Sequence, residues 1–234
     1  MKIEIWSDIM CPFCYIGKRN FEEALGQFAD TENLEIEWKS FQLRPDLVTN
    51  PTKSLNQELA ESKGWSLEYT QQMSEHVTQM AADSGIAFHL DKAIMANTVK
   101  GHQLLHFAKE HGKQNQAKEL LFKAYFTDGK NVDEPSILME IAKSLELNTE
   151  ELTKIFADGT YLNDIERDIY EASQIGVRGV PFFVFDQKYA ISGAQASSAF
   201  LQTLQTSFSN WQKTHSKSQL EVSEGDSCAV DGTC

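Results

Sequence analysis

Two cysteines separated by two residues, Cys11 and Cys14, are the side chains in this sequence best suited to chemistry. Thiols at this spacing can form and break a disulfide with each other, or they can supply half of a zinc site. A pair that lies where a strand passes into a helix is typical of redox motifs. Thiol–disulfide exchange is therefore the favoured interpretation, and zinc binding is the alternative.

The segments on either side of the pair predict a strand that leads directly into a helix. Residues 1–8 alternate, with Ile3 and Ile5 on one side and charged residues on the other, which indicates a short strand. Proline is well tolerated in a first helical turn, so Pro12 is consistent with a helix that begins at the cysteines. The predicted helix runs to about Ala29 because apolar residues recur at helical spacing, at Phe21, Ala24, Leu25 and Phe28.

This position assigns a role to each cysteine. The first turn of a helix offers unpaired N–H groups and the positive end of the helix dipole, so we expect a lowered pKa for the Cys11 thiol. Cys14 lies one turn further along, where it is better shielded but still close enough to bridge Cys11. We therefore expect Cys11 to attack a substrate disulfide and Cys14 to resolve the mixed disulfide that results.

The composition limits the class of protein. The chain has 234 residues, of which 41% are hydrophobic, and a formal net charge of −13, which argues against nucleic acid as a partner. No stretch approaches the roughly 20 apolar residues of a membrane span, and no charged segment followed by an apolar run marks a secretory signal. We expect a cytoplasmic protein without membrane contact. Four cysteines in two close pairs are too few for a disulfide scaffold.

The rest of the chain predicts an α/β protein with a large helical insertion. Alternation at 33–41 predicts a half-buried second strand, parallel to the first through a right-handed crossover. Helical spacing dominates from about 54 to 174. The apolar run 180–185 and the segment 189–192 then predict a β-hairpin, followed by a helix at 197–211.

This order predicts a thioredoxin fold whose βαβ and ββα halves are separated by an all-helical lid. The predicted parts are a thioredoxin-like domain (1–50 and 165–212), a helical insertion (51–164) and a C-terminal tail (213–234) that carries the second cysteine pair.

The motifs resemble those of a known family. The sequence is similar to the DsbA-like thioredoxin-fold dithiol–disulfide oxidoreductases and, within them, to the cytoplasmic FrnE-like group. The matching segments are Ser7-Asp8 with Cys11-Pro-Phe-Cys14, Phe41-Gln-Leu-Arg-Pro45, Asn97-Thr98 with Gly101-His102-Gln-Leu-Leu105, and Gly176-Val-Arg-Gly-Val-Pro181.

The resemblance implies residue roles as well as a fold. It makes Cys11 the nucleophile, Cys14 the resolving thiol and Pro181 a cis-proline packed against them. Val180 would present its backbone to a bound peptide in the manner of an added strand. The two residues between the cysteines, Pro12 and Phe13, complete the expected substrate-binding set.

One departure from the family concerns the dipeptide between the cysteines, which is Pro-Phe here and Pro-His in the periplasmic oxidant. Phenylalanine cannot hold a thiolate as histidine can, so we do not assign a strongly oxidising potential. Oxidation, reduction and isomerisation all remain open. We expect no organic cofactor and no metal, with glutathione open as a co-substrate. The expected partners are protein or peptide disulfides and the thioredoxin or glutathione systems, and a homodimer remains open.

A second cysteine pair, Cys228 and Cys234, lies close to the C-terminus. The FrnE-like group suggests a second redox pair that exchanges with the first. A surface disulfide without a role and a metal chelate are the alternatives. Acidic neighbours raise the pKa of a thiol, so these cysteines are expected to be slower nucleophiles than Cys11.

Other functions and residues are weighed beside this interpretation. The same fold supports glutathione-dependent isomerases and kappa-type transferases, although there a serine typically replaces the first cysteine; a peptide-binding holdase or a metal-binding protein is the non-enzymatic alternative.

Asp8 is expected either to cap its loop or to move protons to the thiols. His102 and His106 are expected to be a satisfied or exposed pair rather than metal ligands. Four aromatic residues are expected to pack in the core or lid, with some lining a substrate groove: Trp65, Phe88, Tyr125 and Phe126.

Overall fold

The computed structural model describes residues 1–215, so Cys228 and Cys234 lie outside the described residues. In chain order the elements are β1 (Lys2–Ser7), α1 (Pro12–Gly26), a 3-10 turn (Thr31–Asn33), β2 (Glu35–Ser40), α2 (Leu55–Lys63), α3 (Leu67–Asp83), α4 (Val99–Glu110), α5 (Gln114–Phe122), a π-helical turn (Lys123–Thr127), α6 (Pro135–Ser144), α7 (Thr149–Asp158), α8 (Leu162–Gln174), β3 (Phe182–Phe185), β4 (Tyr189–Ser192) and α9 (Ser197–His215).

The strands of the described residues form one sheet in the order β2-β1-β3-β4. β1 and β2 are parallel, and β3 is antiparallel to both β1 and β4. Ile5 in β1 lies between Trp38 of β2 and Phe183 of β3. The predicted fold class, an α/β thioredoxin fold with inserted helices, is confirmed.

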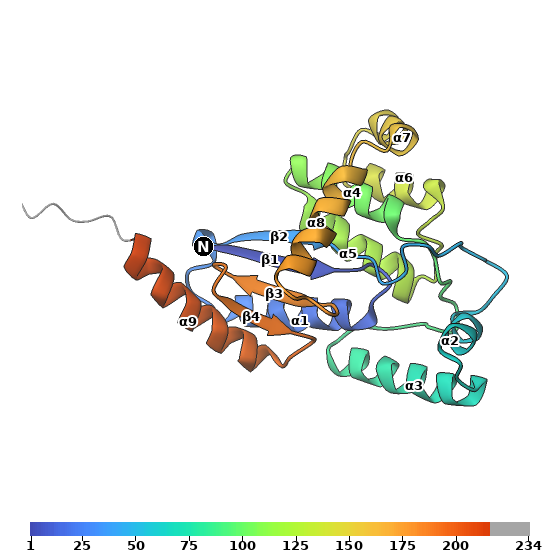
Figure 1. The fold of residues 1–234 in the computed structure, drawn as a ribbon, viewed down its shortest axis with the longest axis horizontal. Coiled ribbons are helices and arrows are strands. Elements are labelled where there is room, and N and C mark those ends of the chain that lie inside the picture. Colours follow the sequence, from blue (N-terminus) through green and yellow to red (C-terminus); the bar gives the residue numbers. More distant parts are fainter. Residues whose placement is uncertain (216–234) are drawn as a thin grey trace, which may run out of the picture.

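One face of the sheet is covered by α1 and α9 (Figure 1). Ile3 and Ile5 point to this face, where they pack with Phe183 of β3. Phe21 of α1 and Phe200 of α9 close the cluster, with their ring centroids 5.6 Å apart. Aromatic side chains bury large apolar areas, so this cluster holds α1, and with it the cysteines, against the sheet.

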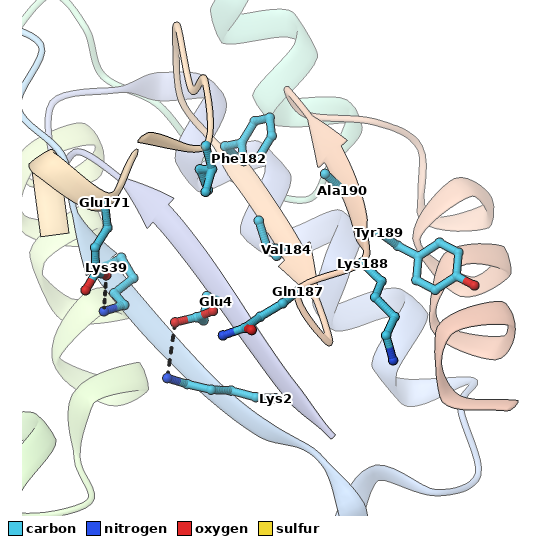
Figure 2. A pocket seen from close by; sticks show the side chains of 11 residues that line it. Lys2, Glu4, Lys39, Glu171, Phe182, Val184, Gln187, Lys188, Tyr189 and Ala190 are labelled. Atoms are coloured by element: carbon cyan, nitrogen blue, oxygen red, sulfur yellow. Dashed lines mark hydrogen bonds and ion pairs between the residues drawn. The ribbon is translucent and has the colours of Figure 1, made fainter. Parts of the chain in front are cut away.

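The opposite face is covered by α8 over β1 and β2. Trp6 packs there with Ala172, and its indole N–H donates a hydrogen bond to the Asp168 carbonyl at 2.8 Å. Beside α8 this face carries a hollow of about 720 Å³ that is lined by residues of all four strands. Figure 2 shows the side chains that line it. Its charged side chains form ion pairs, among them Lys39 with Glu171. The described residues that line it include no thiol or imidazole, so it is not the site of the predicted chemistry.

A side chain of the inserted helices forms hydrogen bonds with the free backbone groups of the edge strand β2. The Gln114 amide accepts a hydrogen bond from the Trp38 N–H at 3.0 Å and donates one to the Trp38 carbonyl at 2.8 Å. These two bonds replace those of a further strand, and such pairing protects an exposed sheet edge. They also fix α5 beside the sheet.

The inserted helices lie in two groups, with the α2–α3 pair set apart from α4, α6 and α7 (Figure 1). α3 contacts α1, and α4 contacts α5, α6, α7 and α8. No helix within residues 1–215 combines the length and the apolar character needed to cross a membrane.

Some element boundaries differ from those predicted. α1 ends at Gly26 rather than near Ala29, and α9 continues to His215 rather than ending at Trp211. The cap of α7 is Asn148, whose side chain accepts hydrogen bonds from the backbone of Glu150 and Glu151. Helix ends depend on which side chain reaches the free N–H groups, and apolar spacing does not reveal this.

Candidate active site

The two cysteines lie at the start of α1, at the carboxyl end of β1. Cys11 is the N-cap, with extended backbone (φ −88°, ψ 112°), and Pro12 is the first helical residue. Both cysteines are free thiols and are buried, with Cys11 3% exposed and Cys14 fully enclosed. The strand-to-helix position expected for the pair is therefore present.

The segment before β3 meets the cysteines across a large sequence separation. The Cys11 thiol donates a hydrogen bond to the Val180 carbonyl at 3.4 Å. The Val180–Pro181 peptide bond is cis. A Cβ atom built on Gly17 of α1 would lie only 3.0 Å from the Pro181 ring, so the proline packs directly on the helix that carries the cysteines.

This close approach predicts opposite effects of alanine at two glycines of α1. Gly17→Ala is expected to destabilise the protein by about 1 kcal/mol, because a rigid ring must move to admit the methyl group. Gly26→Ala is expected to stabilise it by up to about 1 kcal/mol, since nothing lies within 4 Å of its Cβ position and alanine favours helix. Urea unfolding measures both. A stabilised Gly17→Ala protein would show that Pro181 is not held against α1.

The ionisation of Cys11 differs from the expected one. The pKa of its thiol is raised well above the ordinary value, first by the hydrogen bond with the Cys14 sulfur and then by burial and by the Cys14 charge. The backbone N–H of Cys14, at the helix start, acts in the expected direction and lowers the pKa, but its effect is smaller. The expectation of a lowered pKa is wrong for this reduced pair, because burial and the neighbouring Cys14 sulfur outweigh the effect of the helix N–H on the Cys11 thiol.

Asp8 ties the cysteine turn to two other segments. Its carboxylate is fully buried, accepts a hydrogen bond from the Leu43 N–H at 2.7 Å, and lies 3.3 Å from Nε2 of His102. Burial alone would raise the pKa of Asp8, but the hydrogen bonds from the His102 ring and the Leu43 N–H hold it below its usual value. The carboxylate therefore anchors the cysteine turn to distant segments, whereas the expected cap of its own loop is not among its side-chain hydrogen bonds.

The two histidines of α4 are both buried, and each faces a carboxylate that the sequence pattern did not reveal. Nε2 of His106 lies 3.3 Å from Asp168 and 3.1 Å from the Ser40 hydroxyl. Burial lowers the pKa of His102, so its ring is neutral near pH 7 and donates from Nε2 to Asp8. Within residues 1–215 no group of three His, Cys, Asp or Glu side chains is arranged to hold a metal ion.

Lys118 of α5 was not singled out from the sequence, yet it is fully buried near the cysteines. Its ammonium donates a hydrogen bond to the Ser7 carbonyl at 3.4 Å, at the end of β1. The charges that act on it most strongly are those of Cys14, Asp8 and Cys11. The helical lid thus contributes a cation to the surroundings of the thiols.

An apolar pocket of about 330 Å³ opens beside the cysteine turn. Pro12 and Phe13 line it together with residues of α2 and α3. Three of the four aromatic residues weighed in the sequence line it: Trp65, Tyr125 and Phe126. The fourth, Phe88, stacks on Tyr15 and Phe126 within the core.

Comparison with known proteins identifies a family and a curated relative that are similar to this chain. The family model of the DSBA-like thioredoxin domain matches residues 2–205. The protein YwbO of Bacillus subtilis, itself uncharacterized, is 26% identical over 211 residues, which span 85% of this chain and 92% of that protein.

Solved structures match along the whole chain. A probable DsbA oxidoreductase from Streptomyces coelicolor is 32% identical, with a TM-score of 0.83 and coverage of 100% of this chain and 98% of that one. The cytosolic disulfide reductase DsbM from Pseudomonas aeruginosa is 13% identical, with a TM-score of 0.63 and coverage of 92% and 98%. The second likeness concerns the fold alone.

Proposed function

The chain belongs to the DSBA-like thioredoxin domain family, and we propose that it is a thiol–disulfide oxidoreductase or isomerase of protein or peptide disulfides. Cys11 is the nucleophile and Cys14 the resolving thiol. The proposal includes a cytoplasmic location, where thioredoxin or glutathione returns the pair to its working redox state. No organic cofactor takes part.

One observation carries this proposal: the Cys11 thiol, at the N-terminus of α1, lies 3.4 Å from the Val180 carbonyl, with Cys14 one turn further along. A substrate strand that lies along Val180 would bring its disulfide to Cys11. Attack by Cys11 releases one substrate sulfur and leaves a mixed disulfide. Attack by Cys14 on that bond releases the other sulfur and closes the Cys11–Cys14 disulfide.

The apolar pocket supports a preference among substrates. Its walls adjoin the cysteine turn through Pro12 and Phe13, so a side chain that flanks the substrate cysteine can enter it. Burial of such a side chain contributes about 1–3 kcal/mol. We therefore assign disulfides with apolar flanking residues as the preferred substrates.

The proposal is tested by the reduction potential of the pair. Full-length protein is equilibrated with glutathione buffers, the remaining thiols are alkylated, and the Cys11–Cys14 disulfide is measured by mass spectrometry. A single two-electron transition is expected. A protein that forms no Cys11–Cys14 disulfide under any buffer contradicts the proposal. The same titration of a Cys228→Ser/Cys234→Ser variant tests coupling to a second redox pair. The curve shifts if the redox state of the second pair changes the stability of the Cys11–Cys14 disulfide.

Loss of the Phe13 ring is expected to weaken use of peptide substrates selectively. Phe13 is 39% exposed at the pocket wall, so Phe13→Ala removes contact area without opening the core. We expect kcat/KM to fall about tenfold for a disulfide peptide with flanking leucine, and to stay unchanged for a small uncharged disulfide. Tyr170→Ala, at an exposed ring of α8 away from the pocket, is the control. Equal losses for both substrates would contradict the assignment of the pocket.

A further inference from the structure

We propose that Lys118 is the proton acceptor for Cys14 in the resolving step, and that the helical insertion supplies this group. The inference rests on the proposed function, because it assigns a group to one step of that reaction. It places part of the redox site outside the thioredoxin-like strands and helices, on α5.

The geometry that carries the inference is the enclosure of the amine. Lys118 is fully buried, and its Nζ atom lies 3.4 Å from the Ser7 carbonyl, 4.8 Å from the Phe122 ring centroid and 5.5 Å from that of Trp38. Cys14 is also fully enclosed. Phe122 in turn stacks on Tyr15, the residue after Cys14, with ring centroids 4.9 Å apart, so the amine lies on the side of α5 that packs on the cysteine turn. A thiol cut off from solvent needs an internal group to take its proton, and a lysine amine is such a base.

A second buried lysine shows what is unusual about Lys118. Lys18 of α1 is almost as enclosed, but its ammonium lies 2.6 Å from each of two carboxylates, Glu22 and Glu119. Within residues 1–215 Lys118 forms no salt bridge; a carbonyl and two aromatic rings surround it. An unpaired buried ammonium is costly, and a lysine in such a place readily gives up its proton.

The charged groups around the amine favour transfer from Cys14. Burial lowers the pKa of Lys118 to about 8, and the charges of Cys14, Asp8 and Cys11 partly offset that effect, while Lys18 adds to it. Both forms of the amine are therefore populated near neutral pH. Proton transfer from the thiol leaves a thiolate beside an ammonium, which is stabilised in this enclosed place.

The step balances without any further reactant. In the mixed disulfide, Cys14 gives its proton to the Lys118 amine and its sulfur attacks Sγ of Cys11. The bond from Cys11 to the substrate sulfur breaks, the Cys11–Cys14 disulfide forms, and the substrate leaves as a thiolate. The substrate gains two electrons over the cycle and the cysteine pair loses them. Lys118 then returns the proton to solvent.

A symmetric aromatic disulfide that releases a coloured thiol at each step separates the two reactions. Excess reduced full-length protein with Cys228→Ser/Cys234→Ser, in which Cys11 and Cys14 are the only cysteines, is mixed with it in a stopped-flow instrument. The first release reports attack by Cys11, and the second reports resolution by Cys14. In Lys118→Met we expect the second rate to fall about a hundredfold at pH 7, and to rise with pH as hydroxide replaces the amine. The first rate should change less than about threefold.

Matched variants keep the test decisive. Lys18→Met removes the other buried lysine and is expected to change both rates by less than about threefold and to move the pH profile of the second rate only slightly, because Lys18 is the weakest of the charges that act on Lys118. Lys118→Arg keeps a positive charge but cannot give up its proton at these pH values, and it is expected to be as slow as Lys118→Met in the second step. Replacement of a buried cation by an apolar residue of similar size is usually tolerated, and Lys118→Gln serves the same purpose if the methionine variant does not fold.

The outcomes separate the inference from the proposed function. No coloured thiol from the unaltered protein in either phase would overturn the proposed function. Two phases in the unaltered protein, with an unchanged second phase in Lys118→Met, would overturn only the role of Lys118. Full activity in Lys118→Arg would show that Lys118 acts only as a fixed positive charge. An equal loss in both phases with an unchanged pH profile would show that Lys118 only supports the structure. Either result would likewise overturn the role of Lys118 as proton acceptor.

Discussion

Cys14→Ser is expected to accumulate covalent complexes with its substrates, whereas Cys11→Ser is expected to accumulate none and to lose at least about 10³-fold in the rate of disulfide exchange. The reason is the order of the two attacks. Cys11 caps α1 and contacts the Val180 carbonyl, where a substrate strand would lie, while Cys14 is fully enclosed behind it. Without Cys14 the mixed disulfide on Cys11 cannot be resolved.

Non-reducing electrophoresis and mass spectrometry of the variants measure this difference. The protein is incubated with a disulfide peptide, quenched with acid and alkylated, and the adduct is mapped to a cysteine. Cys228→Ser/Cys234→Ser in the same background removes the remaining thiols and is expected to leave the adduct on Cys11. An adduct on Cys14 in the Cys11→Ser protein would reverse the assigned roles, and equal exchange rates in all variants would remove the pair from the reaction.

Asp8→Ala is expected to destabilise the protein by about 3 kcal/mol. The Asp8 carboxylate is fully buried and serves two donors, the Leu43 N–H and the His102 ring. Alanine leaves both donors without a partner in an enclosed place, and each costs about 1–3 kcal/mol. The loop at Leu43, which lines the apolar pocket, loses its anchor to the cysteine turn. Urea unfolding and the rate of the first thiol release measure the two effects.

A surface carboxylate provides the control for this loss. Asp128 pairs with Lys123 at 2.8 Å, and both side chains are partly exposed. Asp128→Ala is expected to change the free energy of unfolding by less than about 1 kcal/mol. If Asp8→Ala and Asp128→Ala cost the same, the buried hydrogen bonds of Asp8 contribute nothing beyond those of an exposed pair.

The buried pair of Asp8 and His102 predicts that the free energy of unfolding falls as the pH drops below about 6.5. Burial lowers the pKa of His102 in the folded protein, so below about pH 6.5 the unfolded chain takes up a proton that the folded chain does not. Asp8 adds a second loss at lower pH, since its lowered pKa favours the folded state fully only above about pH 4. Urea midpoints between pH 7 and 5 measure the first loss. His102→Gln keeps a donor to Asp8 and should flatten that slope. An unchanged slope would show that another titratable group causes the loss of stability.

The sequence by itself determined the features that depend on local patterns. The strand before Cys11, the helix after it and the hairpin after Pro181 follow from alternation and from helical spacing, because burial of one face imposes these periods on neighbouring residues. The thioredoxin order of strands followed from the order of these elements. The groove aromatics Trp65 and Tyr125 could be proposed, but their positions on its wall could not, because they depend on how α2 and α3 pack on the rest of the chain.

Only the tertiary structure decided the chemistry around the thiols. The partner of Asp8 lies 94 positions away in His102, and the raised pKa of Cys11 results from its enclosure with Cys14. Lys118 belongs to one helical stripe, since the buried positions of α5 are Gln114, Ala117, Lys118, Leu121 and Phe122. Two of them are polar, which hides the stripe in the sequence. A pattern shows which face is apolar, whereas burial of a polar side chain depends on the partners that distant segments bring to it.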